Sequence, residues 1–234
     1  MSNLWVFADS YGFLPADRYD EWKNKHWYRL LSDKLGCYKD FKSISHNGCS
    51  NEWISFQIEN AFQKISADDY IVIITTDKDR EWFFPNNVGV SNIYINNIEK
   101  HISRNHAVAI DYYKNFLKDN YQADIRFNWY VNYIKYKFRN HQFIIVPGFE
   151  NNSNSIVYND NFSTTGTLFD ICKSEIKKND QLAWEKWIRS YGGIDPRVGH
   201  LSYQNHKVLS EKIYNCFSNL EDLDLTKDFY EEFR

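Results

Sequence analysis

The stretch Asp68-Asp-Tyr-Ile-Val-Ile-Ile-Thr-Thr-Asp77 decides the fold of this chain of 234 residues. Residues 71–74 (Ile-Val-Ile-Ile) are its most apolar β-branched run, and such a run predicts a central strand buried on both faces. Residues 4–7 (Leu-Trp-Val-Phe) and residues 142–146 (Gln-Phe-Ile-Ile-Val) predict two further strands. Residues 41–46 alternate in polarity before Asn47-Gly48, which predicts another strand followed by a turn.

Segments with apolar residues at helical spacing alternate with these strands. They cover residues 19–35, 51–65, 92–140, 168–176 and 202–217. Gly36 is a stop signal for the first helix, and Ser50 or Asn51 is a suitable cap for the second. Strands that alternate with helices indicate an α/β protein in which a parallel sheet is covered on both faces.

The length and the composition favour one domain over residues 1–234. Hydrophobic residues make up 43% of the chain and aromatic residues 18%, which is enough for a large core. The net charge of −3 gives no general attraction to nucleic acid or to an anionic membrane surface. Residues 219–234 are acidic and weakly patterned, and we expect them to form a loosely attached tail.

The four cysteines lie far apart, with no CxxC pair, so we expect free thiols packed as small hydrophobic groups and no metal site. The first residues lack the pattern of a secretory signal, and no apolar run approaches the length of a membrane span. We therefore expect a soluble protein of the cytosol, although a virion component would show the same pattern.

Two loops carry the residues of a candidate nucleophile and its base. Ser10 follows the first predicted strand directly, where a serine is held rigidly at the edge of the sheet. His200 precedes the last helix, and Asp195 lies upstream, where a carboxylate could orient the imidazole ring. The alternatives are that Asp9 and Ser10 form a polar turn and that His200 is a helix-entry histidine without chemistry.

Two further loops could stabilise developing negative charge. Gly48 follows the second strand and permits a close approach of backbone N–H groups. Thr76 and Arg80 follow the third strand and could donate to an oxyanion or to a substrate oxygen. The alternative for this third loop is a solvated turn containing an Asp–Arg ion pair.

The order of these groups along the chain resembles the SGNH/GDSL hydrolase family. The first block of that family, Gly-Asp-Ser at the end of the first strand, is similar to Ala8-Asp9-Ser10. Its second-block glycine is matched by Gly48. Its final block, Asp-x-x-His, is similar to Asp195 and His200, although here the two residues are five positions apart.

The third block of the family, Gly-x-Asn-Asp, is where this sequence departs. Ile74-Thr75-Thr76-Asp77 occupies its place, so Thr76 stands where the oxyanion asparagine is expected. The run from Thr76 to Arg80 is similar to a variant found in SGNH-like proteins of tailed phages. In that variant a Thr or Ser, with an Arg four residues later, replaces the Gly-x-Asn-Asp block.

The resemblance implies a three-layer α/β/α, flavodoxin-like fold with a mainly parallel five-stranded sheet, to which residues 92–140 add a helical insertion. It also implies a serine esterase that works through a covalent acyl-serine, without a metal or an organic cofactor. Ser10 would be the nucleophile and His200 the base, and Asp195 would orient the base.

The resemblance further implies an oxyanion site formed by the N–H groups of Ser10 and Gly48, with help from Thr76 or Arg80. The abundance of Trp, Tyr and Asn suits an O-acetylated carbohydrate as the ester substrate, although most of the aromatic residues are expected in the core.

Two other functions stay open. The altered third block and the longer Asp195–His200 spacing fit a catalytically weak or inactive module of the same fold, with a binding or structural role, for example in a phage. A flavodoxin-like nucleotide or flavin binder is disfavoured because the chain lacks a glycine-rich phosphate loop.

Overall fold

The computed structural model describes residues 2–13, 24–37, 42–83, 91–93, 120–149, 156–177 and 200–230. For residues 81–83, 91–93, 120 and 173–177 it describes the backbone alone. None of the described helices is long and apolar enough to cross a membrane.

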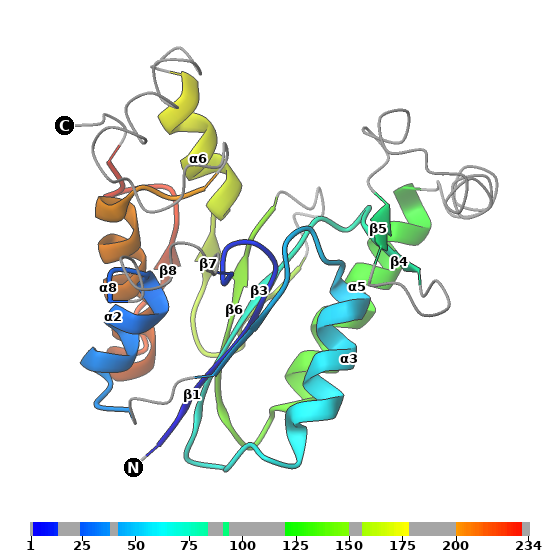
Figure 1. The fold of residues 1–234 in the computed structure, drawn as a ribbon, viewed down its shortest axis with the longest axis horizontal. Helices are drawn as coiled ribbons and strands as arrows, with labels where there is room; N and C mark the ends of the chain where they lie inside the picture. Colours follow the sequence, from blue (N-terminus) through cyan, green and yellow to red (C-terminus); the bar gives the residue numbers. More distant parts are fainter. Residues whose placement is uncertain are drawn as a thin grey trace.

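Four parallel strands form the central sheet (Figure 1). They are β1 (Leu4–Ala8), β2 (Lys42–Ser45), β3 (Tyr70–Thr75) and β6 (Gln142–Pro147), in the spatial order β2-β1-β3-β6. This order, second-first-third-fourth along the chain, is that of the first four strands of a flavodoxin-like fold. The resemblance implied five strands, and four belong to this sheet within the described residues.

Helices cover both faces of the sheet (Figure 1). On one face lie α2 (Trp27–Lys34), α6 (Leu168–Lys177) and α8 (Tyr203–Asn219), and on the other lie α3 (Asn51–Phe62) and α5 (Asn120–Lys137). Successive side chains of a strand point to opposite faces, so β3 supplies Val72 to one core and Ile73 to the other. The result is the three-layer α/β/α architecture.

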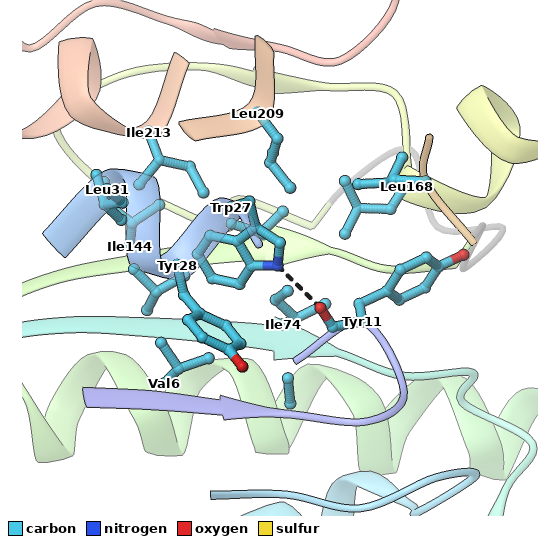
Figure 2. Close-up of a cluster of buried hydrophobic side chains, with 14 of the residues drawn as sticks. Val6, Tyr11, Trp27, Tyr28, Leu31, Ile74, Ile144, Leu168, Leu209 and Ile213 are labelled. Carbon is cyan, nitrogen blue, oxygen red and sulfur yellow. Dashed lines mark hydrogen bonds between the residues drawn. The ribbon is translucent and has the colours of Figure 1, made fainter. Parts of the chain in front are cut away.

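Trp27 lies within the core on the α2 and α8 side and is fully buried there (Figure 2). Its indole N–H donates a 2.8 Å hydrogen bond to the carbonyl oxygen of Tyr11, in the loop that follows β1. The backbone N–H of Trp27 donates to Nδ1 of His206 on α8, at 3.3 Å. One residue therefore joins two helices to the loop that carries Ser10.

The predicted boundaries hold at the start of α3 and at the end of α2, whereas the helix predicted over residues 19–35 begins at Trp27, after the turn of residues 24–26. Ser50 accepts from the N–H of Trp53 at the start of α3, and Ser202 accepts from the N–H of Asn205 at the start of α8. Gly36 follows α2 with a φ of 64°, the left-handed conformation that ends many helices.

The predicted helical segment 92–140 is wrong in its first part. Residues Ser91–Ile93 form β5, which pairs in antiparallel fashion with β4 (Glu81–Phe83). Helix α5 begins at Asn120, and its buried residues Phe127 and Ile134 pack beneath the sheet, so it forms a layer of the fold rather than an addition to it. Residues 94–119 lie outside the described residues.

The predicted loose tail packs against the body of the protein. Residues Leu223–Asp224 form β8, which pairs in parallel with β7 (Thr164–Thr165), and Leu223 and Leu225 are buried. The backbone N–H of Tyr230 donates to Oδ1 of Asn205 at 2.8 Å. A strand of two residues is too short to give a periodic pattern, which is why the sequence did not reveal this packing.

A side-chain amide lies beside β6, the last strand of the described sheet. Asn159 accepts from the N–H of Ile145 through Oδ1 at 2.9 Å and donates through Nδ2 to the carbonyl oxygen of Ile145 at 3.0 Å. The amide therefore bonds the same backbone groups that a neighbouring strand would bond.

Asp69 joins the starts of β1 and β3 through four donors. Its Oδ1 accepts from the backbone N–H of Asn3 at 2.7 Å and from Nδ2 of the same residue at 3.0 Å. Its Oδ2 accepts from Nε1 of Trp5 and from the N–H of Ser66, each at 2.9 Å. Burial opposes ionisation of Asp69, but these hydrogen bonds outweigh burial and lower its pKa.

We predict that Asp69→Asn lowers the free energy of unfolding by about 2–4 kcal/mol, because an amide must turn a donor toward donors that now face a carboxylate. Since the folded pKa of Asp69 is lowered, its stabilising contribution is complete above the ordinary aspartate pKa of about 3.9 and is lost as the pH falls through the folded value. Urea unfolding between pH 2 and 7 measures both effects. The exposed neighbour Asp68 provides the control variant Asp68→Asn, and equal losses in the two variants would contradict the assignment.

Candidate active site

The loops after the four parallel strands meet at one edge of the sheet, as they must when the strands run in the same direction. Two backbone hydrogen bonds tie neighbouring loops together. The N–H of His46 donates to the carbonyl oxygen of Ala8 at 3.3 Å, and the N–H of Gly148 donates to the carbonyl oxygen of Thr75 at 3.0 Å. Ser10, Gly48, Thr76 and Arg80 all lie on these loops.

A buried ion pair lies at the centre of this edge. Asp9, which follows β1 directly, is fully buried, and its Oδ2 accepts from Nη1 of Arg80 at 2.9 Å. The Arg80 side chain is 13% exposed. The other carboxylate oxygen, Oδ1, accepts from the N–H of Tyr11 at 3.1 Å. Arg80 therefore neutralises Asp9 in a place where an unpaired carboxylate would be very costly.

Thr76 completes this buried network. Its hydroxyl donates to Oδ2 of Asp9 at 3.3 Å and accepts from Nη1 of Arg80 at 2.7 Å. Its backbone N–H donates to Oδ1 of Asn51 at 2.9 Å, and its carbonyl oxygen accepts from Nδ2 of Asn51 at 3.0 Å. The first turn of α3 thus holds the loop after β3 by both backbone groups of one residue.

These contacts change the role expected for Thr76, and they give one nitrogen of Arg80 a structural role. The sequence predicted that both residues donate to an oxyanion or to substrate. A threonine hydroxyl has a single proton, and the proton of Thr76 goes to Asp9, so in this arrangement the hydroxyl is not an oxyanion donor. Nη1 of Arg80 bonds Asp9, Thr76 and the carbonyl oxygen of Cys49, the last at 3.5 Å. The alternative was a solvated turn with an Asp–Arg ion pair; an Asp–Arg pair is present, but it is buried and its acid is Asp9 of the first loop.

A row of rings runs from Arg80 to His200. The Arg80 guanidinium lies over the Phe149 ring, 4.6 Å from its centre, and Phe149 lies after β6. The Phe149 ring is 5.9 Å from that of Tyr11, and the Tyr11 ring is 5.6 Å from that of His200. His200 therefore contacts the residue that directly follows Ser10, although 190 positions separate Ser10 from His200 in the chain.

Ser10 and His200 are both partly exposed. The structure brings them to the same edge of the sheet through Tyr11, and their pairing as nucleophile and base remains a prediction. Asp195, the residue predicted to orient His200, lies outside the described residues.

Two glycines shape the loops around Ser10. Gly48 has a φ of 66°, a conformation that favours glycine, which explains the glycine in the turn after β2. Gly12 has no room for a side chain, since an added Cβ would lie 2.7 Å from Cβ of Ala8 and would collide with the hydroxyl of Ser45. The loop that carries Ser10 is therefore packed tightly onto β1 and β2.

Two neighbouring groups that could react, the Cys49 thiol and the Tyr11 phenol, have raised pKa values and therefore stay neutral. Burial, followed by the charge of Asp9, raises the pKa of the Cys49 thiol well above its ordinary value. Burial, followed by the nearby Cys172, likewise raises the pKa of Tyr11. A buried neutral thiol is a poor nucleophile, so Cys49 is not a candidate nucleophile at this edge of the sheet. All four cysteines are free thiols, and the described residues contain no group of three His, Cys, Asp or Glu side chains that could hold a metal ion.

Sequence reasoning missed the roles of Asn51 and Phe149. Asn51 appeared as an alternative cap for α3, and its buried amide instead holds Thr76. A signal was present in the sequence, because Ser50 already caps the helix and leaves the asparagine for another partner. No local pattern in the sequence marks Phe149 as a partner of Arg80, because an aromatic residue after Pro147-Gly148 fits ordinary core packing equally well.

No protein-family model matches the chain, and no curated protein sequence matches it. Among solved structures, the chain is similar to a crystal structure of a member of the lipolytic protein G-D-S-L family from Veillonella parvula DSM 2008. The two share 11% sequence identity with a TM-score of 0.31, over 64% of this chain and 59% of that chain. A similarity of this size decides neither fold nor function. The α/β/α assignment therefore rests on the strand order and the two cores of this chain.

We predict that Arg80→Met lowers the free energy of unfolding by about 3–5 kcal/mol, because it leaves the Asp9 carboxylate buried without its cation. The double variant Asp9→Asn/Arg80→Met should regain a large part of that loss, since it removes both charges. Urea unfolding of Arg80→Met, Asp9→Asn, the double variant and the wild type gives the coupling energy.

Arg29→Met is the matched control for this cycle. Arg29 lies 3.6 Å from Asp33; the Arg29 side chain is 16% exposed, much as Arg80 is, but that of Asp33 is 64% exposed, and a pair with a solvated partner contributes about 0–1 kcal/mol. A loss for Arg80→Met no larger than that of the control would show that the Asp9–Arg80 pair does not hold the edge of the sheet.

Proposed function

We propose that this protein is a serine hydrolase that cleaves carboxylic esters through a covalent acyl-serine, with Ser10 as nucleophile and His200 as base. The observation that carries the proposal is the contact of His200 with Tyr11, the residue next to Ser10, at the edge of the sheet where active groups gather. The buried Asp9–Arg80–Thr76 network supports it, because it fixes the residue before Ser10.

In the proposed reaction Oγ of Ser10 attacks the ester carbonyl carbon while His200 Nε2 takes the hydroxyl proton. The carbon–oxygen bond to the alcohol then breaks, and the alcohol oxygen receives that proton from His200. Water attacks the acyl-serine in the same manner, with His200 taking its proton and returning it to Oγ of Ser10. The products are one alcohol and one carboxylic acid.

The oxyanion in this mechanism is bound by the backbone N–H groups of Ser10 and Gly48. Arg80 acts as a positioning residue that neutralises Asp9, and Thr76 donates to the same carboxylate. Asp195 or a neighbouring carbonyl oxygen holds the second ring nitrogen of His200. The loss of one oxyanion donor costs an enzyme about 10²–10³ in rate, so a site with backbone donors alone is expected to be slow.

We predict that a fluorophosphonate probe labels the full chain at Ser10, because the probe requires only an activated serine. Ser10→Ala should abolish the adduct, and His200→Ala should slow labelling by about 10²–10⁴-fold, the usual contribution of a general base. Mass spectrometry of the digested protein locates the adduct.

His141→Ala is the control for the loss of a histidine, since His141 directly precedes β6 and lies at the opposite edge of the sheet. It should label at the wild-type rate. If the folded wild type is not labelled, or if the adduct lies elsewhere, the esterase proposal fails and a binding module of the same fold takes its place.

A further inference from the structure

Two connections join the segments that carry Ser10 and His200. The first is the contact between the rings of Tyr11 and His200, whose centres are 5.6 Å apart. The second runs through Trp27, whose indole N–H donates to the carbonyl oxygen of Tyr11 at 2.8 Å (Figure 2). The backbone N–H of Trp27 donates to Nδ1 of His206 at 3.3 Å. His206 lies on α8, six positions after His200, so both connections reach the same end of that helix.

The hydrogen bond to the carbonyl oxygen of Tyr11 lies in the core. Trp27 is 0% exposed and Tyr11 is 3% exposed, which leaves little room for water to replace the indole as donor. A buried carbonyl group that loses its donor is strongly disfavoured, so the loop would have to move to regain one. The indole N–H therefore fixes the position of the peptide group that follows Tyr11.

His206 acts in place of a cap at the start of α2. His26 stands at the N-cap position, and its side chain makes no capping hydrogen bond. The first N–H groups of a helix have no partner within the helix, and that of Trp27 donates to the imidazole of His206. The ring of His26 lies 4.4 Å from that of His206, and both residues are buried. A side chain of α8 therefore determines where α2, and Trp27 with it, begins.

Other hydrogen bonds hold the loop after β1 to the sheet. The N–H of Gly12 donates to the carbonyl oxygen of Asp9 at 3.2 Å, and Oγ of Ser43 in β2 donates to the carbonyl oxygen of Gly12 at 2.8 Å. These bonds place the loop relative to the strands. The bond from Trp27 differs, because it places the loop relative to α8, the helix that His200 precedes.

We propose that Trp27 is a positioning residue of the hydrolase, which sets the distance between Ser10 and His200 by joining the loop after β1 to the start of α8. This inference rests on the proposed function. A base must lie within hydrogen-bonding reach of the proton that it takes, and a displacement of about 1 Å can cost about 10²-fold in rate. Trp27 acts through Tyr11 on one side and through His206 on the other.

The test measures how fast a fluorophosphonate probe labels Ser10 in the full chain. Trp27→Phe keeps an aromatic ring in the core and removes the indole N–H. The rate of adduct formation at saturating probe should fall about tenfold or more, while the half-saturating concentration of the probe stays unchanged. A residue that only stabilises the fold would leave this rate unchanged in the folded protein.

Trp5→Phe is the matched control. Trp5 is also buried, and its indole N–H donates to Oδ2 of Asp69 at 2.9 Å, near the start of β1 and away from the candidate active site. Each variant loses a buried hydrogen bond, so both should unfold at lower urea concentrations than the wild type. Only Trp27→Phe should label slowly, and equal labelling rates in the two variants would overturn the proposal.

His206 offers a second pair of variants that leaves Trp27 in place. His206→Leu removes the acceptor for the N–H of Trp27 and should slow labelling as Trp27→Phe does. His206→Asn places an acceptor oxygen where Nδ1 stood, so it should restore most of the rate. Equal rates in the two His206 variants would contradict the connection through α8.

A second measurement does not depend on labelling. The NMR signals of the His200 ring protons, assigned by their loss in His200→Ala, are shifted by the neighbouring Tyr11 ring. They should move in Trp27→Phe and stay in place in Trp5→Phe. If the wild type labels but neither the rate nor these signals change in Trp27→Phe, the positioning role fails and the esterase stands. An unlabelled wild type would end the esterase proposal and, with it, the catalytic role of Trp27.

Discussion

The ion pair between Asp9 and Arg80 is the interaction on which the functional edge of this protein depends. The Asp9 carboxylate lies fully buried at the end of β1, where a carboxylate without a cation and further donors would be very costly. Arg80 and Thr76 from the loop after β3 supply them, and Nη1 of Arg80 also reaches the carbonyl oxygen of Cys49 after β2. The Arg80 guanidinium therefore joins the loops after β1, β2 and β3.

The Asp9–Arg80 pair also determines what the residues after β3 contact. Arg80 and Thr76, from the loop after β3, hold Asp9 in the loop after β1. In the proposed mechanism, developing negative charge is left to the backbone N–H groups of Ser10 and Gly48, whose loops are shaped by the packing of Gly12 and the turn at Gly48. The ring of Tyr11 contacts both Phe149 and His200, and these contacts join His200 to the packed loops.

Local patterns predicted the framework well and the contacts between distant loops poorly. The apolar runs of β1, β3 and β6 and the cap Ser50 act within a few residues, so their sequence signals are strong. The Asp9–Arg80 pair joins residues 71 positions apart and leaves no local pattern. For that reason the sequence, which leaves an Asp–Arg ion pair open for Arg80, does not identify Asp9 as the partner.

Two other differences from prediction have equally physical reasons. Strands β7 and β8 have two residues each, which is too short to show alternation, so the packed segment that follows α8 resembled a tail. Helix α5 is exposed along one side through Tyr121, Trp129 and Tyr136, which blurs its apolar stripe and made a layer of the fold resemble an insertion.

The most direct measurement is a crystal structure of the protein with a phosphonate bound to Ser10. We expect the phosphonyl oxygen to lie within hydrogen-bonding distance of the N–H groups of Ser10 and Gly48. His200 should face the serine oxygen, and Arg80 should still be paired with Asp9. An Arg80 that has left Asp9 to bind the phosphonyl oxygen would contradict this arrangement, because Arg80 would then be an oxyanion donor and not the residue that holds the first loop.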